Sequence, residues 1–297
     1  PEGFIVGRYA TAGMFIAPPM THGTSGKTPN AYLTYIIALG GIRGQSLAYM
    51  YIDGQSVAID GATHATYGKA VNVGGPYSGI CWVKYYDGTQ TTADPYLLSV
   101  YGAHPTTPWQ SDMIGRDLCY AIVTFKFDTN KYSSLPTLKF VMDGIPLYDP
   151  RADTTVGGSG SQRWNDKTTW VTTKNPKVIA YNVHRGITFA DGSVWGGKSA
   201  DYKLPLANWF AAMNACDSNA SLSGGGVEPA YRCGYEIFVD QEPADILQEL
   251  DKSCSGHTVN DGVYWRTRVG APSAAVYSFT DDDVIATSPS TFTSFGG

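Results

Sequence analysis

The chain has 297 residues, of which 43% are hydrophobic and only 16% are charged, against a usual charged share of about 25%. The formal net charge is −5 and no run of Lys and Arg occurs. These features argue against a nucleic-acid-binding protein that binds phosphates tightly. The length predicts two domains. The low charge indicates a surface partly covered by neighbouring proteins.

The first quarter of the sequence predicts strands joined by turns. Residues 1–20 hold two short apolar runs that stop at Pro18-Pro19, as expected for two short strands. Residues 32–39 form an apolar run with β-branched and aromatic side chains, followed by two glycines, which favours a strand. Residues 46–59 alternate around Asp53-Gly54, a dipeptide suited to the tight turn of a hairpin.

Further strands are predicted at residues 80–86 and 119–127, and the stretch between them is polar and rich in Gly, Thr and Pro. Residues 138–148 alternate around Asp143-Gly144 and are predicted as another hairpin. A Gly/Ser segment at 154–161 is the most linker-like part of the chain. We therefore place the domain boundary there, with domains at residues 1–153 and 154–297.

The second half predicts helices. Asn175 is a suitable N-cap and Pro176 a suitable first helical residue, and helices are predicted near residues 175–185, 205–215 and 243–254. A strand is expected at residues 231–239, and a hairpin over residues 257–269 across Asp261-Gly262. The fold class is therefore α+β and rich in strands.

The five cysteines show no CxxC spacing, which argues against a disulfide framework and against a zinc site; they are Cys81, Cys119, Cys216, Cys233 and Cys254. We expect mostly buried thiols, and Cys216 with Cys233 is the pair to test for a disulfide. No run approaches ~18 apolar residues, so no transmembrane helix is predicted. The missing initial Met fits either removal of that residue or excision from a longer polypeptide.

Motifs for catalysis or metal binding are weak. Asp281, Asp282 and Asp283 form an acidic cluster, but they lack the alternating oxygen ligands and the glycine of a calcium loop. With Thr280, Asp283 resembles a capping box, so a helix cap is favoured. The five histidines are scattered, no G-x-S-x-G occurs, and no Lys-Ser/Thr follows residues 157–160 as a phosphate loop requires. We expect no metal, no cofactor and no catalytic residue.

Two alternatives stay open on composition alone. The 26 acidic residues offer many carboxylate pairs for a glycosidase, although nothing singles out one pair. The seven Trp and 20 Tyr suit stacking on sugars, but they equally suit a β-rich core or a protein interface, which we favour.

A resemblance to a known family rests on segments in a shared order. Tyr148, Asp149, Pro150 and Arg151 close the segment LPTLKFVMDGIPLYDPR, and Trp170 and then Asn175-Pro176 follow it. Downstream, the matching segments are LANWFAAMNACD, YRCGYEIFVDQEPADILQELDKSCSG, GVYWRTRVGA and FTDDDVI. Upstream, the looser matches are IVGRYATAGMF, YMYIDGQSV and GRDLCYAIVTFKFD. Together they resemble the tip attachment protein J family, the central tail-tip proteins of long, non-contractile phage tails.

The resemblance implies a structural role. Members are similar to baseplate hub proteins, in which three copies form a ring that joins the tail tube to the tip or central fibre and surrounds the DNA exit channel. It implies a β-barrel-like first hub domain and an α/β-mixed second one. Expected partners are two further copies of the chain, the distal tail, tape measure and tail-tip proteins, DNA in transit only, and the host envelope indirectly.

The implied location is the virion tail tip, after assembly in the host cytoplasm. Family members are usually longer, with a hub domain before this region and fibre domains after it, so we expect a central segment of a longer protein or a truncated relative. Two rival functions remain: a domain that binds or hydrolyses envelope carbohydrate, and a monomeric linker between tube and fibre.

Overall fold

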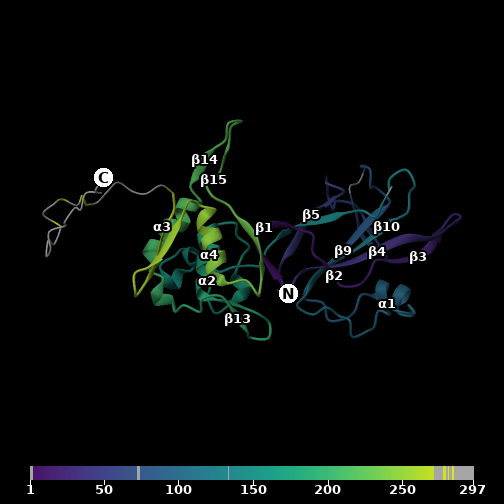
Figure 1. The fold of residues 1–297 in the computed structure, drawn as a ribbon, viewed down its shortest axis with the longest axis horizontal. Coiled ribbons are helices and arrows are strands. Elements are labelled where there is room, and N and C mark those ends of the chain that lie inside the picture. The colour runs from purple at the N-terminus through teal and green to yellow at the C-terminus, as the bar shows by residue number, and fades with distance from the viewer. Residues whose placement is uncertain are drawn as a thin grey trace, which may run out of the picture.

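The computed structural model describes residues 3–71, 74–132 and 134–270, together with residues 277, 278, 280 and 283. Figure 1 shows two lobes along the long axis, a β-rich lobe from the first half and a lobe from the second half that holds most of the helices. The chain is therefore an α+β protein rich in strands, as the sequence predicts. Within the described residues, no helix is long and apolar enough to cross a membrane.

Two antiparallel sheets build the first lobe. The smaller sheet has the order β16-β1-β11-β5-β6; the larger has the order β2-β4-β10-β9-β8-β7, with β3 also paired to β4. The strands of the smaller sheet are β1 (Gly3–Thr11), β5 (Ser46–Ile52), β6 (Gln55–Val57), β11 (Leu138–Asp143) and β16 (Gly234–Phe238). Those of the larger sheet are β2 (Met14–Phe15), β3 (Met20–Ser25), β4 (Thr28–Gly40), β7 (Thr63–His64), β8 (Gly68–Ala70), β9 (Cys81–Asp87) and β10 (Cys119–Lys126).

Strand β1 joins the two lobes because both of its edges are paired. Residues 8–11 pair with β11, and residues 3–7 pair with β16 from the second half of the chain. Successive side chains of a strand point to opposite faces. Phe4 and Val6 therefore enter the core of the second lobe, while Ile5 enters the core of the first.

The larger sheet of the first lobe is covered on both faces. On one face it packs against the smaller sheet through a shared apolar core, which includes Ile37, Met50, Val83, Val123, Phe140 and Met142. On the other face lies α1 (Pro95–Tyr101), whose Leu97 and Tyr101 pack with Ile122. This helix lies in the Gly-, Thr- and Pro-rich stretch where the sequence predicts no element; the side chain of Asp94 caps it by accepting the Leu97 N–H at 2.9 Å.

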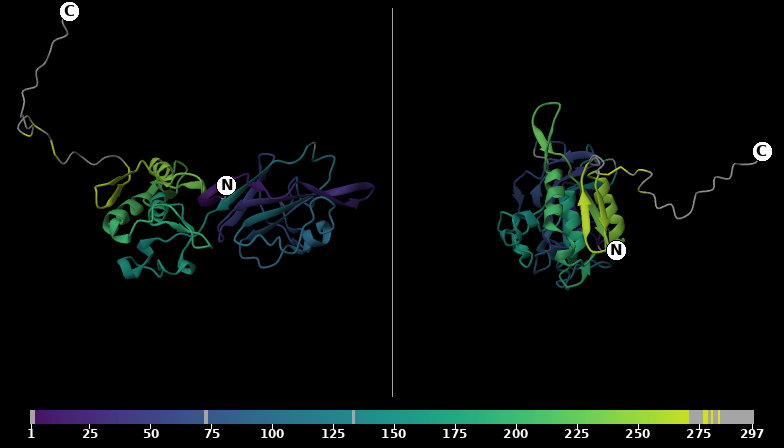
Figure 2. Two further views of the ribbon diagram at one scale, coloured as in Figure 1. Left: turned by 60° about the horizontal axis from the view of Figure 1, so that its bottom comes forward. Right: turned by 90° about the vertical axis from the view of Figure 1, so that its left-hand side faces the viewer.

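Three helices pack together in the second lobe: α2 (Pro176–Arg185), α3 (Leu206–Cys216) and α4 (Pro243–Lys252). Helix α2 is buried from residue 176 to residue 184 and packs against both of the others. Short 3₁₀ helices lie at Pro150–Ala152, Thr154–Val156, Lys167–Thr169 and Asp201–Lys203. Three hairpins complete the lobe: β12 (Ile187–Thr188) with β13 (Val194–Trp195), β14 (Asn219–Ser221) with β15 (Val227–Pro229), and β17 (His257–Asn260) with β18 (Trp265–Arg268). Figure 2 shows that the β14–β15 hairpin projects from the body.

Most predicted elements are present. The strand predicted at residues 32–39 lies within β4. Asp53 (φ 49°) and Gly54 (φ 79°) form the predicted turn between β5 and β6. The three helices predicted in the second half are present as α2, α3 and α4, and the predicted last hairpin is β17–β18.

The hairpin predicted at residues 138–148 is wrong. The N–H groups of Gly144 and Ile145 bond to the carbonyls of Gly7 and Ile5, at 2.7 and 2.8 Å, rather than folding the segment back on β11. Neither Asp143 nor Gly144 has the positive φ that a tight hairpin turn requires. Gly144 is needed for another reason: a Cβ atom there would meet the Ile5 carbonyl oxygen at 2.3 Å.

The Gly/Ser segment 154–161 is a closed loop, so its interpretation as a linker is also wrong. Gly158 N–H bonds to the Asp153 carbonyl, and Ser159 N–H bonds to the Arg151 carbonyl, both at 2.8 Å. A Cβ atom on Gly158 would meet the Arg151 carbonyl oxygen at 2.3 Å, and one on Gly160 would meet that of Ala152 at 2.5 Å. The glycines permit close packing here rather than flexibility. The domain boundary at residues 153/154 stays a prediction.

The cysteines and the acidic cluster can be placed in part. All five cysteines are free thiols and only Cys233 is partly exposed, so Cys216 and Cys233 form no disulfide. The Thr280 N–H bonds to the Asp283 carboxylate at 2.8 Å. This is the contact expected of the predicted capping-box pair, whereas Asp281 and Asp282 lie outside the described residues, and so does the helix that the pair would cap.

Candidate functional site

The turn at Tyr148–Arg151 opens the second lobe. Asp149 is the N-cap of the 3₁₀ helix Pro150–Ala152, and its carboxylate accepts the Arg151 N–H at 3.0 Å. Pro150 is buried, and its ring fixes φ near the value that the first helical residue needs. Aspartate followed by proline therefore sets the backbone so that the Arg151 side chain turns back over Asp149.

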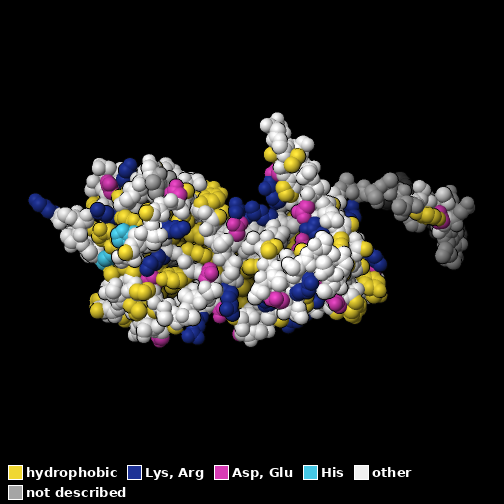
Figure 3. All heavy atoms as spheres, turned by 180° about the vertical axis from the view of Figure 1, so that it is seen from behind, with side chains coloured by type: hydrophobic (Ala, Val, Ile, Leu, Met, Phe, Trp, Pro, Cys, Tyr) yellow, Lys and Arg dark blue, Asp and Glu magenta, His cyan; other side chains and the backbone are white. Residues whose placement is uncertain are grey.

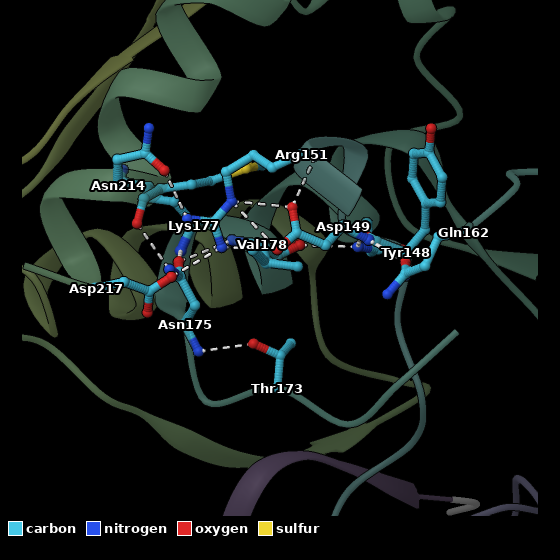
Figure 4. A network of polar contacts seen from close by, with 12 residues as sticks. Tyr148, Asp149, Arg151, Gln162, Thr173, Asn175, Lys177, Val178, Asn214 and Asp217 are labelled. Atoms are coloured by element: carbon cyan, nitrogen blue, oxygen red, sulfur yellow. Dashed lines mark hydrogen bonds and ion pairs between the residues drawn. The ribbon is translucent and has the colours of Figure 1, made fainter. Parts of the chain in front are cut away.

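Arg151 links this turn to the C-terminal end of α3. Its guanidinium forms a two-pronged pair with Asp149, with Nε to Oδ1 at 3.0 Å and Nη2 to Oδ2 at 2.7 Å. The same group donates to Asp217 Oδ2 at 2.8 Å and to Asn214 Oδ1 at 2.9 Å. Figure 4 shows the guanidinium between the turn and these two residues. One side chain thus ties together segments 66 residues apart in the sequence.

The electrostatics of the pair favour the charged forms. Burial alone would lower the pKa of Arg151, but the hydrogen bonds and charges of Asp149 and Asp217 raise that pKa above its ordinary value. A planar guanidinium matches two carboxylate oxygens at once, which a lysine cannot do. We call Arg151 with Asp149, Asn214 and Asp217 the Arg151 clamp. Both the opposite charges and the matching geometry of the groups stabilise it.

Tyr148 belongs to a second, more deeply buried set of contacts. Its hydroxyl donates to Asp153 Oδ2 at 2.7 Å, and Asp153 also pairs with Arg163 at 3.1 Å and accepts from Thr155. Burial would raise the pKa of Asp153, but the Thr155 and Tyr148 hydrogen bonds and the Arg163 charge lower it below its ordinary value. Burial and the neighbouring Asp153 raise the pKa of Tyr148, which therefore stays protonated as a donor.

Two buried amides satisfy the backbone of the turn. The side chain of Asn182, on α2, accepts the Tyr148 N–H at 3.1 Å and donates to the Tyr148 carbonyl at 2.8 Å. Gln162 accepts the Asp149 N–H at 2.8 Å. Buried backbone groups are costly unless they are paired, so these amides fix the turn against α2 and against the loop at 154–161.

Asn175 and Pro176 start α2 and connect it to α3. The Asn175 side chain accepts the N–H groups of Lys177 and Val178, at 3.0 and 3.2 Å, as the predicted N-cap does. Its amide also donates to the Met213 carbonyl on α3 at 2.8 Å. Lys177 is fully buried and pairs with Asp251 near the end of α4. The first turn of α2 therefore fixes both neighbouring helices.

Trp170 covers the outer side of the turn. Its indole N–H donates to the Arg163 carbonyl at 2.8 Å, and its ring lies 5.4 Å from that of Trp164 and 6.1 Å from that of Tyr148. The guanidinium of Arg185 lies over the Trp164 ring at 4.0 Å, a favourable cation–π contact. The aromatic rings thus shield one side of the polar contacts from water.

The structure brings the predicted motif residues into one connected region around the first turn of α2. Their partners are not apparent in the sequence: Asp153, Gln162, Asn182, Asn214 and Asp217 stand in no recognisable motif and meet the turn only through the fold. Asn214 and Asp217 lie within a segment of the family resemblance, which was the one signal that pointed to them.

The polar groups of the network are paired with one another, which suits a role in holding chain segments together. Each of its carboxylates is occupied by an Arg, a hydroxyl or backbone N–H groups. Across the described ranges, no group of three or more His, Cys, Asp or Glu side chains is arranged to hold a metal ion. His184 is buried nearby, and burial lowers its pKa to about 4.

Comparisons with known proteins give little. No family model matches the sequence, and no curated protein matches it. Among solved structures, a chain from "Virion of native gene transfer agent (GTA) particle" has a similar arrangement over 92% of this chain, with a TM-score of 0.45 and 16% sequence identity. The match spans 53%, about half, of that chain.

Proposed function

We propose that this chain is a structural subunit of a phage tail tip, in which three copies close into a hub ring between the tail tube and the tip or central fibre, around the DNA exit channel. The observation that carries the proposal is the network around Arg151. The residues that resemble the tip attachment protein J family are those that tie the turn at residues 148–151, α2 and α3 of the second lobe to one another, which gives a subunit a fixed shape.

The surface supports an assembly role. Both lobes expose large apolar side chains, including Met14 (61% exposed), Leu135, Val171 and Val227. A ring closed by heterologous contacts needs two different low-charge surfaces on each subunit. The net charge of −5 suits a channel through which DNA slides, because fixed cations would hold its phosphates.

The carbohydrate alternative has less support. It requires accessible Trp and Tyr faces, but Trp195 and Trp209 are both buried. The most aromatic part of the first lobe is a stack that runs His64, Tyr67, Tyr32, His22, with ring centroids 4.7, 5.4 and 5.2 Å apart. Here Tyr67 and Tyr32 stack on neighbouring rings and so offer little free face to a sugar. Calorimetry with envelope glycans separates the alternatives: measurable heat would favour carbohydrate binding.

The direct test is the copy number of the chain in purified particles, measured by quantitative mass spectrometry against the tail-tube protein. We expect three copies in each particle, which is three for the six subunits of one ring of a sixfold tail tube, once the tube signal is divided by the number of stacked rings. A single copy would favour the monomeric linker instead.

A further inference from the structure

An apolar groove lies on the first lobe beside β2 and the loop that follows α1. It encloses about 640 Å³, and its lining includes Ile16, Pro18, Pro108, Trp109, Met113 and Tyr120. No charged residue of the described chain lines it. Ile16 and Met113 are each about two-fifths exposed, which is a large apolar exposure for a groove that water fills.

Two polar atoms of the lining have no partner. The indole nitrogen of Trp109 and the hydroxyl of Tyr120 are both buried and form no hydrogen bond within the described residues. A buried donor without a partner destabilises the structure that contains it. Both atoms are closed off from solvent, so an occupant reaches them only when the lining side chains turn. An indole N–H can only donate, so a matching occupant brings hydrogen-bond acceptors together with apolar side chains. Because no charged residue of the described chain lines the groove, an uncharged occupant fits best.

The projecting β14–β15 hairpin has this chemistry. Residues 219–227 contain no charged side chain, and Leu222 and Val227 are 44% and 59% exposed. Around the tip, a Cβ atom on any of Gly224–Gly226 would meet nothing within 4 Å. Figure 3 shows the hairpin standing away from the body, with charged side chains near its base but not at its tip. A two-stranded hairpin is at best marginally stable in water, which favours packing against another surface.

The hairpin and the groove lie on opposite sides of the molecule. In Figure 1 the hairpin rises above the second lobe, whereas α1 and the loop after it lie at the lower edge of the first lobe. A contact between them within one chain is therefore excluded. The same pair of surfaces on two copies gives a head-to-tail contact, the type that repeats around a ring.

We propose that the β14–β15 hairpin of one copy docks into the Trp109 groove of a second copy, where hairpin carbonyl groups accept the Trp109 and Tyr120 hydrogen bonds and Leu222 or Val227 fills the apolar volume. This contact rests on the proposed ring and names its subunit interface. The Arg151 clamp fixes the orientation of the hairpin for this contact, because Arg151 binds Asn214 and Asp217 just before β14 begins. The base of the hairpin is closed by the Ala230 N–H to Ser218 carbonyl bond at 2.7 Å.

The test is photo-crosslinking in assembled particles. The photoreactive amino acid benzoylphenylalanine replaces Leu222, and particles are built from a mixture of ¹⁴N- and ¹⁵N-labelled chains. We expect mixed-isotope cross-links from residue 222 to peptides of the groove (residues 106–120). Val263, 55% exposed at the turn of the β17–β18 hairpin, is the control position and should give no cross-link to those peptides.

Two substitutions provide an independent readout. Val227→Asp places a charge where the groove has none and should abolish assembly, whereas Val263→Asp, at a similarly exposed valine, should not affect it. Trp109→Phe keeps a six-membered aromatic ring but removes the five-membered ring with its N–H, and should weaken assembly roughly fivefold. Three copies in the particle with cross-links from residue 222 elsewhere would overturn the docking contact and leave the ring intact. A copy number other than three would overturn the ring, and the docking contact with it.

Discussion

Replacing Arg151 with alanine tests whether the clamp holds the second lobe together. The Arg151 side chain is 21% exposed and that of Asp149 is 18% exposed, so water screens this pair only partly. Hydrogen bonds to charged groups contribute about 1.5–3 kcal/mol each to stability. Without the guanidinium, the Asp149 carboxylate keeps only its hydrogen bond from the backbone N–H of residue 151. The pair with Asp217, which is 42% exposed, adds less than about 1 kcal/mol. We expect Arg151→Ala to lower the free energy of unfolding by about 3 kcal/mol.

The assay is urea unfolding followed by tryptophan fluorescence, supported by calorimetry. A loss of this size corresponds to a fall in Tm of about 5 °C for a chain of 297 residues. Arg266→Ala is the matched control: Arg266 pairs with Asp261 on the surface, where the side chains are 50% and 37% exposed, and its loss should cost less than about 1 kcal/mol. Equal effects of the two substitutions would refute the reasoning, because burial and geometry would then make no difference.

Three further predictions concern the closed loop, a buried histidine and the thiols. Gly158→Ala should destabilise the fold by about 2 kcal/mol in urea unfolding, because its Cβ would meet the Arg151 carbonyl oxygen at 2.3 Å. Gly224→Ala, in open space, should change the free energy of unfolding little, and equal losses for the two substitutions would contradict the closed loop at residues 154–161. Burial lowers the pKa of His184 from its usual 6.5 to about 4, so the neutral ring stabilises the fold fully above pH 6.5 and this contribution is lost as the pH falls toward 4. Between pH 7 and pH 5 the loss should be about 2 kcal/mol, and His184→Gln should remove it; an unchanged pH slope would contradict this. Ellman's reagent should find at most Cys233 reactive in the native protein and all five thiols in urea without reductant, and a lower count in urea would indicate a disulfide.

Local chemistry made much of the fold predictable. Asn175-Pro176 predicts the start of α2, because the cap and the fixed φ act within one turn. Asp53-Gly54 predicts a hairpin for the same kind of reason, since both residues tolerate positive φ. Asp94-Pro95 carries a similar signal for α1, but that helix was not predicted because the Gly, Thr and Pro residues after it mask a helix of only seven residues.

The rest depends on contacts between distant segments. Asp143-Gly144 looks like a hairpin turn, yet Gly144 is glycine because the β1 backbone passes within 2.3 Å of where its Cβ would stand. The glycines at 154–161 look like a linker, yet Gly158 and Gly160 lie against the turn that they close. In the candidate site, Asp149 and Arg151 flank one proline in the sequence and form a local ion pair. Their longer-range partners, Asn214 and Asp217, are fixed only by the packing of α3.

Electron cryo-microscopy of the assembled particle tests the central proposal most directly. The proposal predicts three copies of this chain in a closed ring below the tail tube, each with the β14–β15 hairpin against the Trp109 groove of its neighbour and with the DNA path through the centre. A peripheral position, or a single copy without ring contacts, would contradict it.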